Sequence, residues 1–159
     1  MEHMTTLERL TADLTASMKA RTAFQTNTLR QMIAAVRTAA KAGSVARELT
    51  EEQVQAVLSS EVKKRRESAQ IYMTAGAGER AATETSEADL IESYLPVALS
   101  IEQLGVIVSD AIAATGAATI KDMGKVMKVA TASAAGLGRL DSKALSERVR
   151  SALTGAGEI

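Results

Sequence analysis

Several side chains that carry common enzyme chemistry are missing from this sequence or nearly so. Cysteine is absent, and the 159 residues include one histidine, His3, close to a chain end where structure frays. These absences exclude a thiol nucleophile, a disulfide and a cysteine zinc site, and they leave no ordered histidine for a Ser-His-Asp triad. We therefore expect no catalytic residue, no metal site and no cofactor.

Long apolar runs and an excess of either charge are also absent. No segment has the apolar core of a signal peptide or an apolar run long enough to span a bilayer. We therefore expect a soluble cytoplasmic protein without a membrane partner. The 19 basic residues balance the 19 acidic ones, so any anionic partner must be met by a local patch of charge.

Aromatic residues and proline are scarce, and this scarcity favours helices. The three aromatic residues are Phe24, Tyr72 and Tyr94, and Pro96 is the single proline. The core must therefore be built from Leu, Ile, Val, Met and much Ala, and Ala-rich windows have high helix propensity. One proline imposes few helix breaks. The sequence predicts an all-α fold.

Apolar residues recur at helical spacing through the first 95 residues and predict four helices. The first covers about residues 6–21, and the second begins after Phe24 and ends before Gly43. The third opens with a capping box of Thr50 and Gln53, runs to Gly76 and is the longest. A fourth, acidic helix over about 79–94 is expected to lie against the third. The expected inward-facing residues of the first three helices are Leu7, Leu10, Leu14 and Met18, then Leu29, Met32, Ile33, Val36 and Ala40, then Val54, Val57, Leu58, Val62, Ala69, Tyr72 and Met73.

Pro96 marks the expected boundary between two domains, 1–95 and 96–159, because proline disfavours helical geometry in the residue before it. The second domain is predicted to hold three short helices. One follows a capping box of Ser100 and Gln103, one covers about residues 119–134, and Asp141 caps the last. The predicted architecture is an N-terminal four-helix region with a long third helix, followed by a small three-helix C-terminal domain. The expected inward-facing residues of the middle helix are Ile120, Met123, Val126, Met127 and Ala130.

Three segments, taken in order, resemble a known family. They are the run EVKKRRESAQIY from Glu61 to Tyr72, the tripeptide Tyr94-Leu95-Pro96, and the segment from Asp122 to Met127. With them the chain is similar to the YqeY family from Leu7 to about Leu153. Members of that family are stand-alone relatives of the tail of the B subunit of tRNA-dependent amidotransferase.

The resemblance implies a tRNA-binding role and no catalytic residue. No stretch of the chain is similar to the activating domain of that enzyme or to its amidase subunit. A carbon-nitrogen ligase activity with glutamine as amido donor would therefore belong to the multidomain relatives.

The block from Lys63 to Arg66 is the most obvious basic run, and two interpretations of it stay open. Basic runs bind nucleic acid by neutralising phosphates. Consecutive helical residues, however, point in directions about 100° apart, so the four cannot all face one ligand. In the alternative interpretation Arg65 or Arg66 bridges to the acidic fourth helix, and the block is a charged belt on a scaffold helix.

A better basic surface is predicted in the tail. Residues 121–150 hold seven basic and three acidic residues, an excess that suits an RNA backbone, and a solvated helix face is the alternative explanation. Three of the cations stand at i, i+4 and i+7 and so share one helix face. Arg139 lies in a turn, Gly138 to Ser142, that resembles a turn of the family and makes it a candidate phosphate contact. The predicted RNA-binding residues are Lys121, Lys125, Lys128, Arg139 and Lys143.

Gly124 interrupts the same predicted helix, at a cost of about 1 kcal/mol relative to alanine. We interpret it as a site of close helix packing, with the approach of a ligand to exposed backbone as the alternative. With three aromatic residues in the chain, base stacking cannot be the main mode of RNA recognition. We expect shape and phosphate contacts to dominate.

Three functions stay open, in order of preference. The first is a tRNA-binding accessory protein, non-catalytic by itself, whose partners are tRNA and tRNA-handling proteins. The second is a helical adaptor that binds proteins through the exposed faces of the second to fourth helices, without RNA. The third is an enzyme, which requires turnover by the purified chain alone.

Overall fold

The computed structural model describes residues 3–155, and within this range the chain is helical and forms no β-strand. The predicted all-α fold is confirmed. A short 3₁₀ turn, η1, precedes the sixth α-helix. The elements are α1 (Thr6–Ala20), α2 (Ala23–Ala40), α3 (Glu51–Thr74), α4 (Gly78–Glu92), α5 (Ile101–Thr115), η1 (Ile120–Asp122), α6 (Met123–Ala134) and α7 (Ser142–Gly155).

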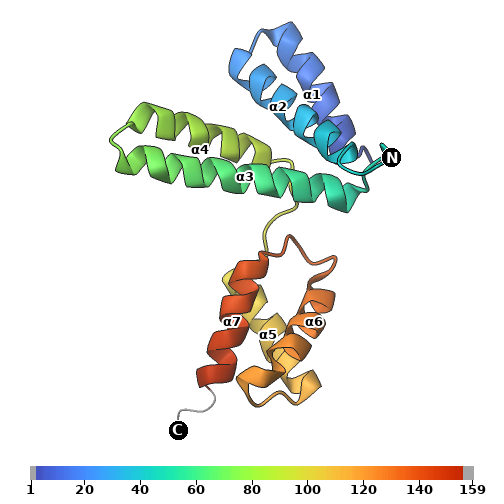
Figure 1. Ribbon diagram of the computed structural model, residues 1–159, viewed down its shortest axis with the longest axis vertical. Helices are drawn as coiled ribbons and strands as arrows, with labels where there is room; N and C mark the ends of the chain where they lie inside the picture. The colour runs from blue at the N-terminus through green and yellow to red at the C-terminus, as the bar shows by residue number, and fades with distance from the viewer. Residues whose placement is uncertain (1–2, 156–159) are drawn as a thin grey trace. The chain divides into compact units, whose positions relative to one another are not determined.

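The chain up to Leu95 forms a compact unit of two antiparallel helical hairpins, α1–α2 and α3–α4 (Figure 1). As predicted, α3 is the longest helix of the described part, with 24 residues. Core residues within a helix stand three or four positions apart, as Leu29, Met32 and Ile33 do, and this spacing places them on one face. The core of this unit consists of Leu10, Leu29, Met32, Ile33, Leu58, Val62, Ala88, Ile91, Tyr94 and Leu95.

Local capping sets where α3 and α5 begin. The Gln53 amide donates to Thr50 Oγ1 at 3.2 Å, and the Thr50 amide donates to Gln53 Oε1 at 3.0 Å. Ser100 and Gln103 make the same reciprocal bonds, at 3.0 and 2.8 Å. Each box satisfies two backbone donors that the start of a helix leaves open. Both predicted capping boxes are confirmed.

Tyr94 ties the end of the N-terminal unit to its beginning. Its side chain is buried, its hydroxyl donates to Asp13 Oδ2 on α1, and the Arg9 guanidinium lies 5.1 Å from the ring centre. Burial raises the pKa of the Tyr94 hydroxyl, and the hydrogen bond to Asp13 and the charge of that carboxylate raise it further. Because Leu95 joins the same core, the Tyr94-Leu95 pair has a packing role.

Some residues predicted to face the core are exposed instead. Met18 is 44% exposed, Met73 62% and Ile120 45%. Met18 and Met73 stand in the last turn of their helices, where the apolar stripe runs beyond the core. Beside Met18 the buried position is taken by Ser17, whose hydroxyl lies 2.8 Å from that of Thr26. A hydrogen-bonded polar pair thus fills the place where an apolar stripe was predicted.

The chain from Pro96 forms a second compact unit around α5, α6 and α7. The loop before α7 lies against the segment before α5: the Arg139 amide donates to the Val97 carbonyl at 2.9 Å, and the Leu99 amide donates to the Arg139 carbonyl at 3.0 Å. Gly138 permits this approach, because a Cβ there would lie 2.8 Å from the Val97 carbonyl oxygen. The core of this unit consists of Leu99, Leu104, Ile107, Val108, Ala111, Val126, Ala130, Ala134, Leu145, Val149 and Leu153.

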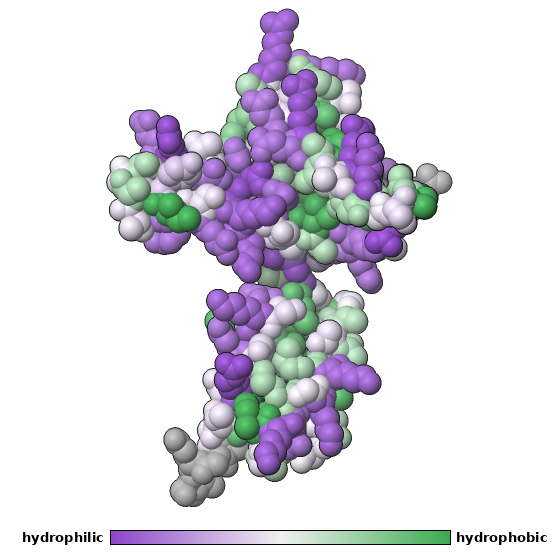
Figure 2. All heavy atoms as spheres, in the orientation of Figure 1, coloured by the Kyte–Doolittle hydropathy of each residue, from purple (hydrophilic) through white to green (hydrophobic). Residues whose placement is uncertain are grey.

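The surfaces of the two units differ in character. Figure 2 shows strongly hydrophilic residues over much of the N-terminal unit, and many weakly hydrophobic ones on the C-terminal unit in this view. No single helix in residues 3–155 has both the length and the apolar composition needed to cross a membrane; α5 and η1–α6 pass that test only as a pair bent by 98°.

Candidate nucleic-acid interface

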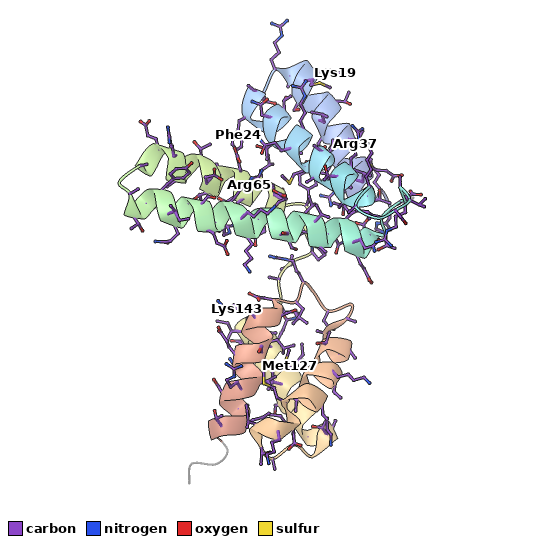
Figure 3. All side chains as sticks on the ribbon, in the orientation of Figure 1. Lys19, Phe24, Arg37, Arg65, Met127 and Lys143 are labelled. Carbon is purple, nitrogen blue, oxygen red and sulfur yellow. The ribbon has the colours of Figure 1, made fainter. Side chains whose placement is uncertain are left out.

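Arg65, the third residue of the basic block, is buried where α2, α3 and α4 meet (Figure 3). Its Nε donates to Glu87 Oε2 at 2.9 Å, its Nη1 to Glu61 Oε2 at 2.7 Å and its Nη2 to Gln31 Oε1 at 2.6 Å. Burial alone would raise the pKa of Glu61. The hydrogen bond from Arg65 and the charges of Lys64 and Arg65 outweigh burial and hold this pKa below its ordinary value. The Arg65 side chain therefore has a structural role.

Arg66 is also held by the acidic helix. Its Nη2 donates to Asp89 Oδ1 at 3.0 Å and to Glu92 Oε2 at 2.5 Å, both on α4. The prediction that Arg65 or Arg66 bridges to the fourth helix is confirmed, and both arginines do so. Lys63 and Lys64 stay exposed, and Lys64 lies 3.4 Å from a Glu61 carboxylate oxygen. The block is thus divided between an internal ion network and an ordinary helix surface.

The predicted lysine row of the tail begins on a 3₁₀ turn and not on an α-helix. Lys121 lies in η1, whereas Lys125 and Lys128 lie on α6. Asp122 Oδ2 accepts from the backbone amide of Ala118 at 3.0 Å, which stabilises the turn. A 3₁₀ helix advances about 120° per residue against about 100° in an α-helix, so Lys121 is rotated off the straight i, i+4 line. The single helix predicted over 119–134 is wrong in this respect.

All three lysines of the row are exposed, and none makes an ion pair with another residue of the described part. One carboxylate stands among them. Backbone hydrogen bonds from Ala118 and Thr119 lower the pKa of Asp122, and the charge of Lys125 lowers it further. Asp122 therefore remains ionised and offsets part of the local positive charge.

The two remaining predicted residues lie at a different place in the C-terminal unit. Arg139 is half-buried in the loop before α7, and Lys143 is exposed in the first turn of α7. Since α6 and α7 run in opposite directions, their first turns lie at opposite ends of the unit (Figures 1 and 3). The 14 residues of α7 span roughly 20 Å. Lys121 and Lys143 thus lie at two separate places and do not form one compact patch.

Asp141 has the structural role predicted for it. Its Oδ1 accepts from the amides of Lys143 at 3.0 Å and Ala144 at 3.2 Å, so it caps the start of α7.

The interpretation of Gly124 as a packing contact is wrong. A Cβ at Gly124 would meet no atom within 4 Å beyond its chain neighbours and the backbone of its own helix, because Gly124 is exposed on the first turn of α6. Close approach occurs at Gly105 instead, where a Cβ would lie 2.6 Å from Arg148 Nη2. The backbone of the first turn of α6 is therefore open, with Lys121 and Lys125 nearby in sequence.

A model of the Yqey-like protein family matches residues 7–153 of the chain. The chain belongs to the YqeY family. This match confirms the resemblance inferred from the three sequence segments, and its range includes every predicted RNA-binding residue. No protein of known, curated description matches the chain.

A further basic surface of this YqeY-family chain, on the α1–α2 hairpin and the residues after it, is not among the predicted RNA-binding residues, although Arg30, Arg37 and Lys41 share one polar face by their spacing. Residues 14–47 include six basic residues and no acidic one. The length of this stretch without acidic residues could have revealed the basic surface, because its cations are dispersed and form no basic run. In residues 3–155, no group of three or more His, Asp or Glu side chains is arranged to hold a metal ion.

Proposed function

We propose that this YqeY-family protein is a tRNA-binding accessory protein, non-catalytic by itself, that contacts RNA through its C-terminal unit. The observation that carries the proposal is the set of exposed lysines Lys121, Lys125 and Lys128, which have no acidic ion-pair partner in the described part of the chain. Exposed cations without partners remain available to phosphates.

The open backbone at Gly124 supports the same proposal. A side chain at this position would stand between the first turn of α6 and any approaching ligand. Its absence leaves the backbone of that turn accessible to a phosphate. The Met123 amide already donates to the Ile120 carbonyl, so Lys121 and Lys125 provide the attraction for the phosphate. Arg139 and Lys143 provide a second contact point at the other end of the C-terminal unit, which suits a long ligand such as tRNA.

Salt dependence tests the proposal. In gel-shift titrations with bulk tRNA, three phosphate contacts predict binding roughly 20- to 40-fold weaker at about 200 mM than at about 50 mM monovalent salt. Because contacts to bases are not expected, different tRNAs should bind with similar affinity. Absence of binding at low salt would exclude the proposed function and favour the alternative, a helical adaptor without RNA binding.

A further inference from the structure

The α1–α2 hairpin carries a groove whose cations are not neutralised by the fold. One depression of about 510 Å³ lies between the two helices, and a second of about 450 Å³ continues it toward the tip of the hairpin. Arg30 lines both. We call this surface the arginine groove, and define it by its cations Arg21, Arg30 and Arg37 and its apolar residues Leu14, Met18 and Ile33.

The groove cations differ from the arginines of the basic block in their lack of carboxylate partners among the described residues. Arg65 and Arg66 are paired with carboxylates of α3 and α4, at 2.5 to 3.0 Å. Arg21, Arg30 and Arg37 are exposed, and no carboxylate of the described residues lies within ion-pair distance of any of them. Arg37 also lines a depression that contains Glu48 and Glu51, so Arg21 and Arg30 are the cations of the groove farthest from acidic side chains along its lining. None of the three is held in an ion pair with a described residue that a ligand would have to break.

The Arg30 side chain bridges the two helices of the groove. Its Nη2 lies 3.4 Å from Met18 Sδ on α1, so the guanidinium reaches across from α2 to the facing helix. Arg21 ends α1 in the left-handed region, with φ of 58°, a conformation that glycine adopts at lower cost. Arginine at such a position bears a small backbone strain, and it puts another cation at the tip of the hairpin.

The apolar part of the groove decides between classes of ligand. Ile33 is buried and Leu14 half-buried between the helices, while Met18 is 44% exposed at the end of the groove. A nucleic-acid backbone satisfies the arginines but buries nothing on Leu14 and Met18. An amphipathic helix satisfies both, because its apolar face fills a groove between two helices while its flanking carboxylates meet the cations.

The spacing of the cations further specifies the ligand. Arg30 and Arg37 are seven residues apart on α2, and Lys41 follows four residues later. Seven residues make two helical turns, roughly 10 Å, so carboxylates seven residues apart on a neighbouring helix match the two arginines. We propose that the arginine groove binds an acidic amphipathic helix of a partner protein. This proposal is independent of RNA binding by the C-terminal unit.

A fluorescent synthetic helix tests the proposal on the full chain. The probe has leucines at helical spacing along one face and glutamates seven residues apart beside them. A scrambled peptide of the same composition keeps the charge and removes the amphipathic face. Fluorescence anisotropy is measured at low salt with three proteins: the unmodified chain, Arg30→Glu/Arg37→Glu, and the matched control Lys63→Glu/Lys64→Glu, which makes the same change in net charge.

We expect the acidic helix to bind the unmodified chain and the control with equal affinity, and the groove variant roughly tenfold more weakly. The scrambled peptide should bind less well to all three proteins. A probe with lysines in place of the glutamates should bind the groove variant better than the unmodified chain. The control Lys63→Glu/Lys64→Glu, which has the same net charge, should not show this reversal, and circular dichroism should show that the groove variant is folded.

Three results would overturn the proposal. The first is no binding of the acidic helix to the unmodified chain. The second is equal binding of the scrambled peptide, which would reduce the interaction to unspecific charge attraction. The third is loss of tRNA binding, instead of peptide binding, in Arg30→Glu/Arg37→Glu, which would assign the groove to RNA.

Discussion

The Arg65 guanidinium on α3 and the Glu87 carboxylate on α4 form an ion pair of 2.9 Å in which the two side chains are only 10% and 18% exposed. Glu61 adds a second carboxylate at 2.7 Å from Arg65, and Gln31, on α2, accepts a hydrogen bond from Arg65. A residue that looks like part of a nucleic-acid block therefore joins three helices of the N-terminal unit.

Arg65→Ala is expected to destabilise the chain. It leaves two largely buried carboxylates close together without their cation, and breaking such a pair costs about 2–4 kcal/mol. Urea unfolding followed by circular dichroism measures the loss. Lys63→Ala, on the exposed side of the same helix, is the control and should change the free energy of unfolding by less than about 0.5 kcal/mol. Equal effects of the two changes would show that the Arg65 network contributes no more than a surface charge.

Glu61 makes part of this stability dependent on pH. Its pKa in the folded chain is below its ordinary value of 4.5, so the stabilisation it provides is present above that pH and is lost as the pH falls through the folded pKa. We expect the difference in unfolding free energy between the unmodified chain and Glu61→Gln to be largest near neutral pH and to shrink below this value. A difference that stays constant from neutral to acid pH would contradict the assignment.

Gly138 and Gly105 should respond oppositely to alanine. At Gly138 a Cβ would lie 2.8 Å from the Val97 carbonyl oxygen, which the loop cannot easily move, so Gly138→Ala should cost about 1–3 kcal/mol. At Gly105 a Cβ would lie 2.6 Å from the tip of the flexible, exposed Arg148 side chain, which can swing away. Gly105→Ala should therefore be neutral or stabilise α5 by up to about 1 kcal/mol. Thermal unfolding compares the two, and similar losses in both would contradict the account.

Replacing Gly124 by alanine should change stability and RNA binding in opposite directions. Since a Cβ there has open space around it, Gly124→Ala should raise the free energy of unfolding by about 0.5–1 kcal/mol. If the open backbone serves phosphate approach, the same change should weaken tRNA binding several-fold. A more stable variant with unchanged tRNA affinity would remove Gly124 from the proposed interface.

Features that depend on a few neighbouring residues were predictable from the sequence. The capping boxes at Thr50 and Ser100 need side chains three residues apart, and they occur where predicted. The apolar stripes were predictable in the middle of helices but not at their ends. Met18 and Met73 continue the helical pattern and are nevertheless exposed, because the sequence does not say how far a neighbouring helix extends.

The candidate interface depended on the path of the chain, which was harder to predict. Charge alone could not show that Arg65 is buried, since that depends on Glu87 and Gln31 from two other helices. The separation of Lys121 from Lys143 follows from the opposite directions of α6 and α7 (Figure 1). The break in the lysine row depends on Asp122, whose hydrogen bond to Ala118 stabilises a 3₁₀ turn in place of the predicted helix start.

In the proposed function, the exposed lysines of the C-terminal unit bind the tRNA backbone. The most direct test measures the affinity of bulk tRNA for Lys121→Glu/Lys125→Glu/Lys128→Glu against Lys19→Glu/Lys63→Glu/Lys64→Glu. The second variant changes the net charge equally at exposed lysines of the N-terminal unit. Circular dichroism should show that both are folded, because all six side chains are exposed.

Charge reversal in the C-terminal unit should weaken tRNA binding by roughly tenfold or more and reduce its salt dependence, because phosphate contacts are lost. Charge reversal in the N-terminal unit should leave both nearly unchanged. Equal losses in the two variants would mean that net charge alone governs binding. A loss confined to the N-terminal variant would refute the proposal and place the RNA surface on the N-terminal unit.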